Sequence, residues 1–139
     1  MTDLPPAGFQ PFGVTDGFIG LSGPYYWRED SAGQPEFGFQ TDARHGNPNG
    51  VLHGGAVLTF LDTILGHAVV KRAQRPCATI SLDSRFIGTA APGEWIGGRI
   101  TVKKLTRGFA FIDAEAFAGD KLLVTATAIF RIFEVETRK

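Results

Sequence analysis

The chain has 139 residues and carries 14 lysines and arginines against 14 aspartates and glutamates, so its formal net charge is zero. This length predicts one domain whose core is large enough to fold without disulfides or a structural metal. The neutral balance argues against binding to a nucleic acid backbone, because such proteins are usually basic. The single cysteine, Cys77, excludes an internal disulfide framework and a cysteine-rich zinc site. A reducing compartment fits this cysteine content, so we expect a cytoplasmic protein.

The first part of the chain predicts an arm followed by a hairpin. Residues 1–17 are rich in proline and glycine and show no periodicity, so we expect a surface arm that precedes a domain at residues 18–139. Residues 24–28 and 36–41 are rich in aromatic side chains, as strands often are. The segment between them has the composition of a turn, so the two strands are expected to pair.

The middle of the chain predicts one buried helix over residues 54–72. Apolar residues recur there at helical spacing and cover most of the helix surface, which is typical of a helix inside a core. The longest apolar run, residues 54–70, is short for a membrane span and contains Asp62 and His67. We therefore expect no membrane partner. His67 and His45 are expected to be structural or surface residues.

The rest of the chain predicts a series of strands joined by short turns. Residues 78–86 alternate between apolar and polar side chains, and Ser81 is expected on the same strand face as Thr79. Further strands are expected at 95–105, 109–117 and 122–133. Consecutive strands with short turns form an antiparallel meander. The expected fold class is α+β, with one long buried helix on a curled antiparallel sheet of five to six strands.

Asp62 is the most informative residue of the chain. It is the only formally charged side chain between Arg44 and Lys71, and it lies in the middle of the predicted helix. An unpaired carboxylate in such an apolar place costs several kcal/mol if it is desolvated, so something must offset that cost. Two explanations remain open: a polar edge or hydrogen-bond anchor of the fold, and a catalytic carboxylate in a cleft.

The segment His53-Gly54-Gly55 stands at the expected start of the helix. Helices usually begin with Ser, Thr, Asp or Asn, whose side chains bind the N–H groups of the first turn. A bare pair of glycines is expected to leave these N–H groups open at the positive end of the helix dipole, where they could stabilise an oxyanion. The alternative is that the glycines let the helix pack closely against the sheet.

The spacing of these two features predicts a dimer. Gly54 and Asp62 are eight residues apart, and at about 1.5 Å per residue they lie roughly 12 Å apart along one helix. A single carbonyl does not reach both an oxyanion donor and a catalytic carboxylate across that distance through direct contacts. If both residues act on one substrate, they come from different subunits of a homodimer with two composite sites.

Residues 47–62, Asn-Pro-Asn-Gly-Val-Leu-His-Gly-Gly-Ala-Val-Leu-Thr-Phe-Leu-Asp, resemble the signature of the hotdog-fold acyl-CoA thioesterases of the phenylacetate-degradation type. That signature has an asparagine, a gap, a glycine, an apolar segment, His-Gly-Gly, and an aspartate nine residues after the histidine. Every element keeps its spacing in this chain. Residues 79–86 resemble the next strand of the family, and the resemblance in strand order covers about residues 18–134.

The resemblance implies the fold, the reaction and the catalytic residues of a thioester hydrolase. Asp62 would activate a water or attack the thioester carbonyl directly, and the Gly54 N–H would polarise that carbonyl. Asn47 would orient the thioester or the water, and His53 would position the carbonyl region and shape the helix start. Thr79 would help to hold the water. The family places the acyl chain between the two helices of a dimer, and its dimers often pair into tetramers.

Further residues are expected to contact an acyl-CoA substrate. They comprise a helix-start glycine, a second hydroxyl near Thr79, an aromatic pocket wall and basic residues for the phosphates of coenzyme A: Gly55, Ser81, Phe86, Arg85, Lys103, Lys104 and Arg107. Core packing or solvent exposure is the alternative for each of them. Coenzyme A would be part of the substrate, and no cofactor or metal is expected, because no cluster of residues has metal-ligand spacing.

Two other functions remain open. A hotdog-fold hydratase or dehydratase would pair a histidine with a carboxylate, in a motif that is not visible in this sequence. A non-catalytic acyl-CoA-binding protein would bind thioesters without turnover, and a shared fold does not separate it from an enzyme. The sequence does not define the acyl group, and it leaves open whether Asp62 acts as a base or as a nucleophile.

Overall fold

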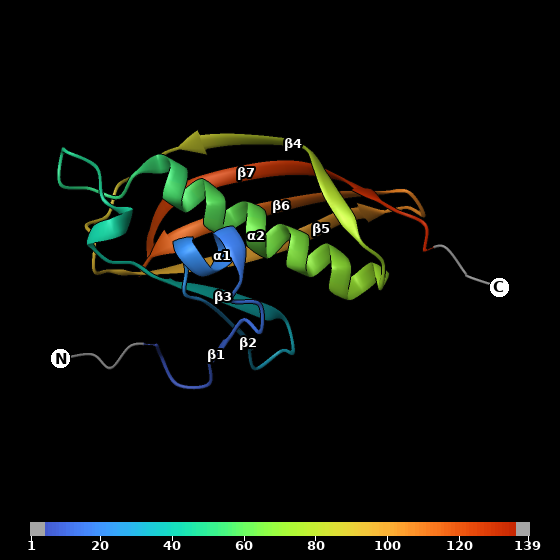
Figure 1. Cartoon of the computed structure of the whole chain (residues 1–139), viewed down its shortest axis with the longest axis horizontal. Coiled ribbons are helices and arrows are strands. Elements are labelled where there is room, and N and C mark those ends of the chain that lie inside the picture. The colour runs from blue at the N-terminus through green and yellow to red at the C-terminus, as the bar shows by residue number, and fades with distance from the viewer. Residues whose placement is uncertain (1–4, 136–139) are drawn as a thin grey trace.

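A seven-stranded antiparallel sheet curls around one long helix in the computed structural model, which describes residues 5–135 (Figure 1). The strands lie in the order β1-β2-β3-β5-β6-β7-β4. Their bounds are Gln10–Pro11 (β1), Tyr25–Glu29 (β2), Pro35–Gln40 (β3), Cys77–Phe86 (β4), Trp95–Leu105 (β5), Phe109–Ala118 (β6) and Lys121–Ile132 (β7). The helical elements are α1 (Gly17–Ser22), the short 3₁₀ helix η1 (Ala43–His45) and the long helix α2 (Gly54–Ala73). The predicted α+β class is confirmed, with one or two strands more than expected.

The extra strand lies in the segment that was expected to be a surface arm. Gln10 and Pro11 form β1 and pair with Trp27 and Tyr26 of β2. Phe12 follows them into the core, where only 9% of its surface is exposed. Gln10 and Pro11 are exposed, as a surface arm would be, but they belong to the sheet, and the expectation of a surface position is wrong for Phe12. A two-residue strand that pairs with a distant segment has no periodicity of its own, so the sequence gives no local signal for it.

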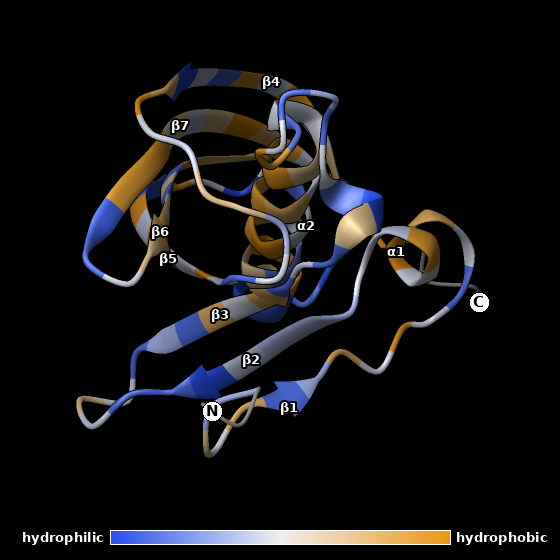
Figure 2. Cartoon of the chain, turned by 90° about the vertical axis from the view of Figure 1, so that its left-hand side faces the viewer, coloured by the Kyte–Doolittle hydropathy of each residue, from blue (hydrophilic) through white to orange (hydrophobic). Residues whose placement is uncertain are grey.

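The core is formed by α2 and the concave face of the sheet. Seven side chains of the helix are buried: Val57, Phe60, Leu61, Ile64, Leu65, Ala68 and Val69. Figure 2 shows hydrophobic residues along α2 and on the strands that curve around it. A Cβ at Gly98 of β5 would stand 2.7 Å from the Phe60 ring and 2.8 Å from Ile64, so this glycine lets the helix lie directly on the sheet.

Helix α2 is apolar on almost every side, as the sequence predicts. By length and composition alone, this helix could cross a membrane. However, 39% of its apolar 18-residue stretch is buried inside the protein. The core helix of a globular domain has the same composition. The side of α2 that faces the edge strand β4 carries Asp62 and borders the candidate site.

Candidate active site

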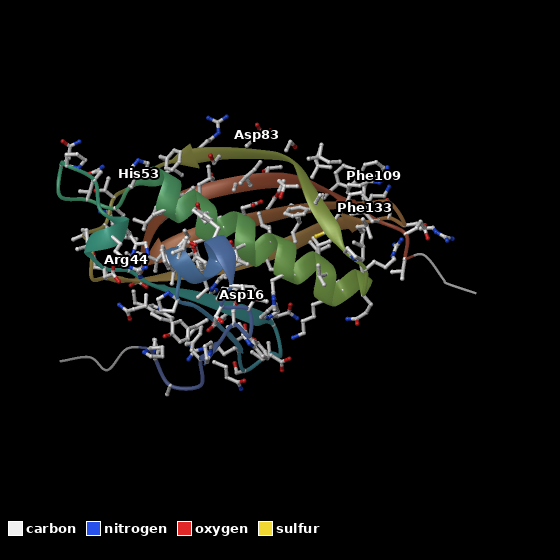
Figure 3. All side chains as sticks on the ribbon, viewed as in Figure 1. Asp16, Arg44, His53, Asp83, Phe109 and Phe133 are labelled. Atoms are coloured by element: carbon white, nitrogen blue, oxygen red, sulfur yellow. The ribbon has the colours of Figure 1, made fainter. Side chains whose placement is uncertain are left out.

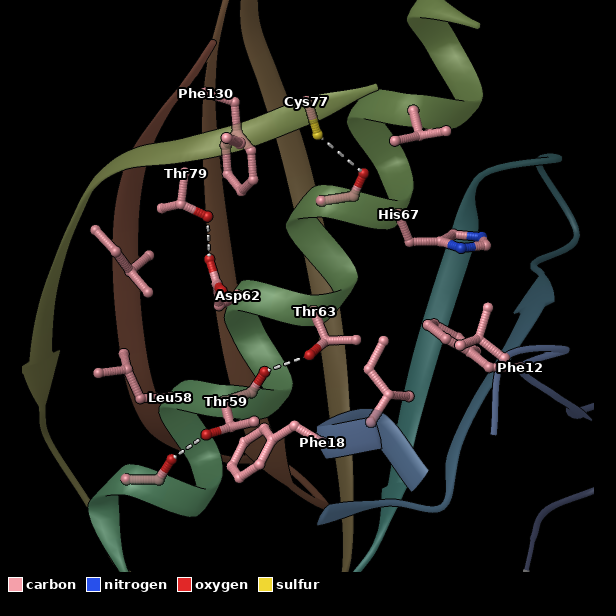
Figure 4. Close-up of a pocket in the computed structure, with 17 residues that line it drawn as sticks. Phe12, Phe18, Leu58, Thr59, Asp62, Thr63, His67, Cys77, Thr79 and Phe130 are labelled. Atoms are coloured by element: carbon pink, nitrogen blue, oxygen red, sulfur yellow. Dashed lines mark hydrogen bonds between the residues drawn. The ribbon is translucent and has the colours of Figure 1, made fainter. Parts of the chain in front are cut away.

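Asp62 and Thr79 form a hydrogen-bonded pair between the long helix and the edge strand. The Thr79 hydroxyl donates to Asp62 Oδ1 at 2.7 Å (Figure 4). Asp62 projects from the middle of α2, and Thr79 from the third position of β4. The pair satisfies one oxygen of the carboxylate and leaves the other without a protein partner among residues 5–135. This arrangement offsets part of the cost of a carboxylate in an apolar helix.

A β-bulge in β4 aims Thr79 at the helix. Thr79 is paired with Phe130 of β7, whereas Ser81 is paired with the adjacent residue Ile129. Because neighbouring residues of a strand face opposite sides of the sheet, Thr79 and Ser81 also face opposite sides. The expectation that Ser81 shares the face of Thr79 is therefore wrong, since the extra residue, Ile80, shifts the alternation by one. Thr79 alone lies beside the carboxylate.

The pair lies in a cavity of about 760 Å³ that is bounded by α2, the edge strand β4 and the N-terminal segment. The lining comes from the N-terminal segment, α2, β4 and β7: Phe12, Val14, Phe18, Ile19, Gly55, Leu58, Thr59, Asp62, Thr63, Gly66, His67, Val70, Cys77, Ala78, Thr79, Leu82 and Phe130. Figure 4 shows Asp62 on the side of α2 that faces β4, and His67 and Phe12 on the opposite side. Most of this lining is apolar, so the cavity suits a hydrophobic group beside a carboxylate.

The hydroxyl groups of the two threonines on α2 in this cavity are used by the protein itself. The hydroxyl of Thr59 donates to the Gly55 carbonyl, and that of Thr63 donates to the Thr59 carbonyl, each at 2.7 Å. Burial, and then the charge of Asp62, raise the pKa of the Cys77 thiol above its ordinary value. A thiol with a raised pKa is a poor nucleophile. Asp62 is therefore the group in this cavity best suited to act as a base or nucleophile.

The start of α2 is capped by a histidine rather than left bare. His53 Nδ1 accepts the Gly55 N–H at 2.8 Å, and Figure 3 shows His53 at this end of the helix. The expectation that both glycine N–H groups are open is wrong for Gly55, because an imidazole nitrogen accepts as a capping side chain does. The Gly54 N–H has no hydrogen-bond partner among residues 5–135. It is the N–H that the helix start offers to a ligand.

The two glycines also have a packing role. A Cβ at Gly54 would stand 2.9 Å from the Phe86 ring, and a Cβ at Gly55 would stand 2.9 Å from His53 Nδ1. Phe86 thus packs against the helix start and does not line the cavity around Asp62 within one chain. Close packing against the sheet therefore explains Gly54, which also has an open N–H, whereas the near neighbour of Gly55 is its own cap, His53.

Asn47 shapes the loop before the helix. Its side-chain oxygen accepts the N–H of Asn49 at 2.9 Å and that of Val51 at 3.4 Å. Asn47 does not line the cavity that contains Asp62 within one chain. Its amide nitrogen carries two further donors.

The four basic candidates lie away from the cavity of their own chain. Lys103 is 3.8 Å from Asp113, and Arg107 is paired with Glu134 at 2.9 Å. The Arg107 side chain accordingly lowers the pKa of the Glu134 carboxyl. Arg85 and Lys104 are exposed on β4 and β5. The structure therefore brings Asp62, Thr79 and Gly55 together, and it leaves the basic residues outside.

Several residues of the cavity were not predicted from the sequence. Thr59, Thr63 and Gly66 share the helix face next to Asp62, and their spacing of three or four residues is a signal that a helical projection would have found. Phe12, Phe18 and the rest of the N-terminal wall had no such signal. This wall is held at its far end by the Arg44 guanidinium, which donates to the carbonyls of Leu21 and Gly23, each at 2.7 Å.

Comparison with known families identifies the fold. The family model described as "Thioesterase superfamily" matches residues 49–125, which span the loop, α2 and most of the sheet. The chain belongs to the thioesterase superfamily. A Pseudomonas aeruginosa protein provisionally named an esterase, PA0474, is 32% identical over 129 residues, which cover 91% of this chain and 96% of that protein.

Two solved structures illustrate the shared fold. A thioesterase-like protein of Ralstonia eutropha, described as related to phenylacetic acid degradation, superposes with a TM-score of 0.74 at 24% identity, over 88% of this chain and 92% of its own. A Bacillus halodurans protein crystallised with CoA superposes with a TM-score of 0.72 at 17% identity, over 79% of this chain and 74% of its own. The hotdog fold expected from residues 47–62 is confirmed, and so is the thioesterase family. Within residues 5–135, no group of three or more His, Cys, Asp or Glu side chains could hold a metal ion.

Proposed function

We propose that this thioesterase superfamily member is an acyl-CoA thioesterase, which hydrolyses a thioester to a free acid and coenzyme A. The observation that carries the proposal is the hydrogen bond between Thr79 and Asp62 at the edge of an apolar cavity of about 760 Å³. A carboxylate held beside an apolar pocket suits attack on the carbonyl of an acyl group that the pocket accommodates. The Bacillus halodurans structure has the same fold and contains CoA, which supports coenzyme A as the thiol part of the proposed substrate.

In the proposed mechanism Asp62 is a general base. Its second carboxylate oxygen accepts a proton from a water, and that water attacks the thioester carbonyl. The Thr79 hydroxyl donates its hydrogen bond to Asp62 Oδ1. Its oxygen lone pairs remain free to accept a hydrogen bond from the same water. The bond from the carbonyl carbon to sulfur breaks, and the thiolate of coenzyme A leaves and takes up the proton that Asp62 accepted, which returns Asp62 to its carboxylate form.

The developing oxyanion is assigned to the Gly54 N–H of a second subunit. This N–H stands at the positive end of a 20-residue helix and has no partner among residues 5–135. Within one chain it is eight residues from Asp62, or roughly 12 Å along the helix axis. The proposed site therefore needs a homodimer with two equivalent composite centres.

The edge of the sheet supports a dimer. β4 is the last strand of the sheet and is paired only with β7 among the described residues. Ile80, Phe86 and Ile87, on or next to this strand, are 55%, 57% and 58% exposed. An unpaired edge strand with exposed apolar side chains is a template for association with another copy. A second copy on this side would also bring further residues to the cavity beside Asp62, and pairs of dimers would form the expected tetramer.

The proposal is tested by measuring release of free thiol from short, medium and long acyl-CoAs. Asp62→Asn should reduce kcat/KM by at least about 100-fold with unchanged oligomer size, because it removes the base. Asp120→Asn, which changes an exposed carboxylate in the turn between β6 and β7, is the matched control and should retain activity. No release by the wild type from any acyl-CoA, together with tight binding of some, would replace the enzyme by a non-catalytic acyl-CoA-binding protein.

A further inference from the structure

The cavity beside Asp62 has a second polar side chain at its opposite margin. His67 follows Asp62 by five residues on α2 and lines the same cavity. Five residues advance a helix by roughly 7.5 Å and turn it by about 140°. Figure 4 accordingly shows the imidazole extending from α2 away from the Asp62–Thr79 pair, on the side of Phe12. A ligand that occupies the whole cavity would meet the carboxylate at one margin and the imidazole at the other.

The His67 ring is held in place by aromatic neighbours. The Phe12 ring stacks on it, with a distance of 4.7 Å between centroids and an angle of 30° between planes. The Phe37 ring meets it edge-on, at 5.9 Å and 81°. These contacts come from the segment before α1 and from β3, and they fix the plane of the imidazole. The ring nitrogens are therefore presented in a defined direction without a hydrogen bond to hold them.

Among the polar side chains that line the cavity, His67 is the one without a hydrogen bond to the described residues 5–135. Thr59, Thr63, Thr79 and Asp62 all have one. Burial, and then the neighbouring Lys71 ammonium, lower the pKa of the His67 imidazole. The ring is thus neutral near pH 7 and offers one donor and one acceptor. A ligand group that reaches the ring can use this donor or this acceptor without displacing a hydrogen bond of the described residues.

The part of the cavity between Asp62 and His67 offers no free hydroxyl proton to a ligand. The hydroxyl protons of Thr59 and Thr63 are donated to backbone carbonyls, and Gly66 presents no side chain. Phe18 and Ile19 form the facing wall. An apolar chain fits this stretch, and a polar group is favoured only where it reaches His67.

We propose that His67 binds a hydrogen-bonding group in the distal part of the acyl chain, so that the preferred substrates are acyl-CoAs with a hydroxyl or carbonyl group on the order of 10 Å from the thioester. This inference rests on the proposed thioesterase function and adds the class of acyl group. His67 then determines specificity, and Phe12 positions its ring.

The test compares octanoyl-CoA with 8-hydroxyoctanoyl-CoA, two substrates that differ by one hydroxyl. The wild type should prefer the hydroxylated substrate by about tenfold or more in kcat/KM, which is the worth of one hydrogen bond. His67→Phe keeps an aromatic ring for the stack and cannot form the hydrogen bond, so the ratio of the two kcat/KM values should fall to about one. His67→Gln, which can form the hydrogen bond, should restore part of the preference. Phe18→Leu, on the facing wall, should leave the ratio unchanged.

The outcomes separate this inference from the proposed function. Thiol release from both substrates with equal kcat/KM, or a preference that His67→Phe leaves intact, would overturn the role of His67 and leave the thioesterase standing. If no acyl-CoA is hydrolysed, the proposed function fails, and calorimetric titration of the same two compounds then decides the binding role. Tighter binding of the hydroxylated compound that is lost in His67→Phe would still support it, and equal binding would reject it.

Discussion

The Thr79 hydroxyl and the Asp62 carboxylate meet at 2.7 Å across the gap between an edge strand and the central helix. Their meeting depends on a β-bulge, because the residue inserted between Thr79 and Ser81 turns the first toward the helix and the second away from it. The carboxylate proposed as the catalytic base is thus oriented by a hydroxyl whose direction is set by the register of the sheet.

Replacing Thr79 tests this orientation. Thr79→Val keeps the shape of the side chain and removes the hydrogen bond to Asp62, so kcat/KM for thioester hydrolysis should fall by about tenfold or more. Thr79→Ser keeps the hydroxyl and should retain most of the activity. Ser81→Ala, on the other face of β4, should have little effect. Equal losses of kcat/KM in Ser81→Ala and Thr79→Val would show that the hydrogen bond between Thr79 and Asp62 is not required for activity.

The cap on α2 makes a prediction about stability. His53→Ala leaves the Gly55 N–H without its partner at 2.8 Å, which should lower the free energy of unfolding by about 1 kcal/mol, as the loss of an N-cap does. His53→Asn supplies another capping acceptor and should recover most of that loss. Chemical denaturation of the three proteins, with the midpoints compared at equal slopes, measures the effect. An unchanged midpoint for His53→Ala would contradict the cap.

The residues of the site were partly readable in the sequence. The spacing of His53, Gly54 and Asp62 depends only on contacts along one helix, and a regular helix keeps such spacing in space. Thr79 was placed correctly beside the carboxylate through family resemblance, although alternation along β4 favoured Ser81 equally. A bulge has no reliable mark in the sequence, because it is defined by the pairing with β7.

The parts of the fold that escaped prediction depend on contacts between distant segments. Phe12 is buried because it stacks on His67, which is 55 residues further along the chain, and its proline- and glycine-rich surroundings indicated only a loop. The imidazole cap at His53 was also missed, since histidine is an unusual capping residue. The core helix and the four long strands were predicted because their apolar patterns are local.

The lowered pKa of His67 predicts acid sensitivity. The unfolded chain binds a proton at this ring near the ordinary pKa of about 6.5, whereas the folded chain binds it only at lower pH. The free energy that the neutral ring contributes is therefore present above about pH 6.5 and is lost as the pH falls through the folded-state pKa. The stability of the wild type should fall more steeply below pH 6.5 than that of His67→Phe, as thermal unfolding between pH 7.5 and pH 5 would measure. Parallel curves for the two proteins would contradict the shift.

The proposed mechanism needs no metal. A water activated by Asp62 and held by Thr79 is sufficient for hydrolysis, so prolonged dialysis against EDTA should leave thiol release unchanged. Elemental analysis of the active protein before dialysis provides the control. Loss of activity that a divalent cation restores would assign the activation of water to a metal instead of to Asp62.

The central claim is that the carboxylate of one subunit and the helix-start N–H of another act on one thioester. Asp62→Asn removes the first, and Gly54→Ala displaces the second, because its Cβ would stand 2.9 Å from the Phe86 ring of the same chain. The two inactive variants, carrying different affinity tags, are co-expressed and the mixed dimer is purified through both tags. One of its two composite centres then contains the intact Asp62 and the intact Gly54, so the mixed dimer should recover about half of the wild-type rate per dimer. A mixed dimer that remains as inactive as its two parents would contradict the claim.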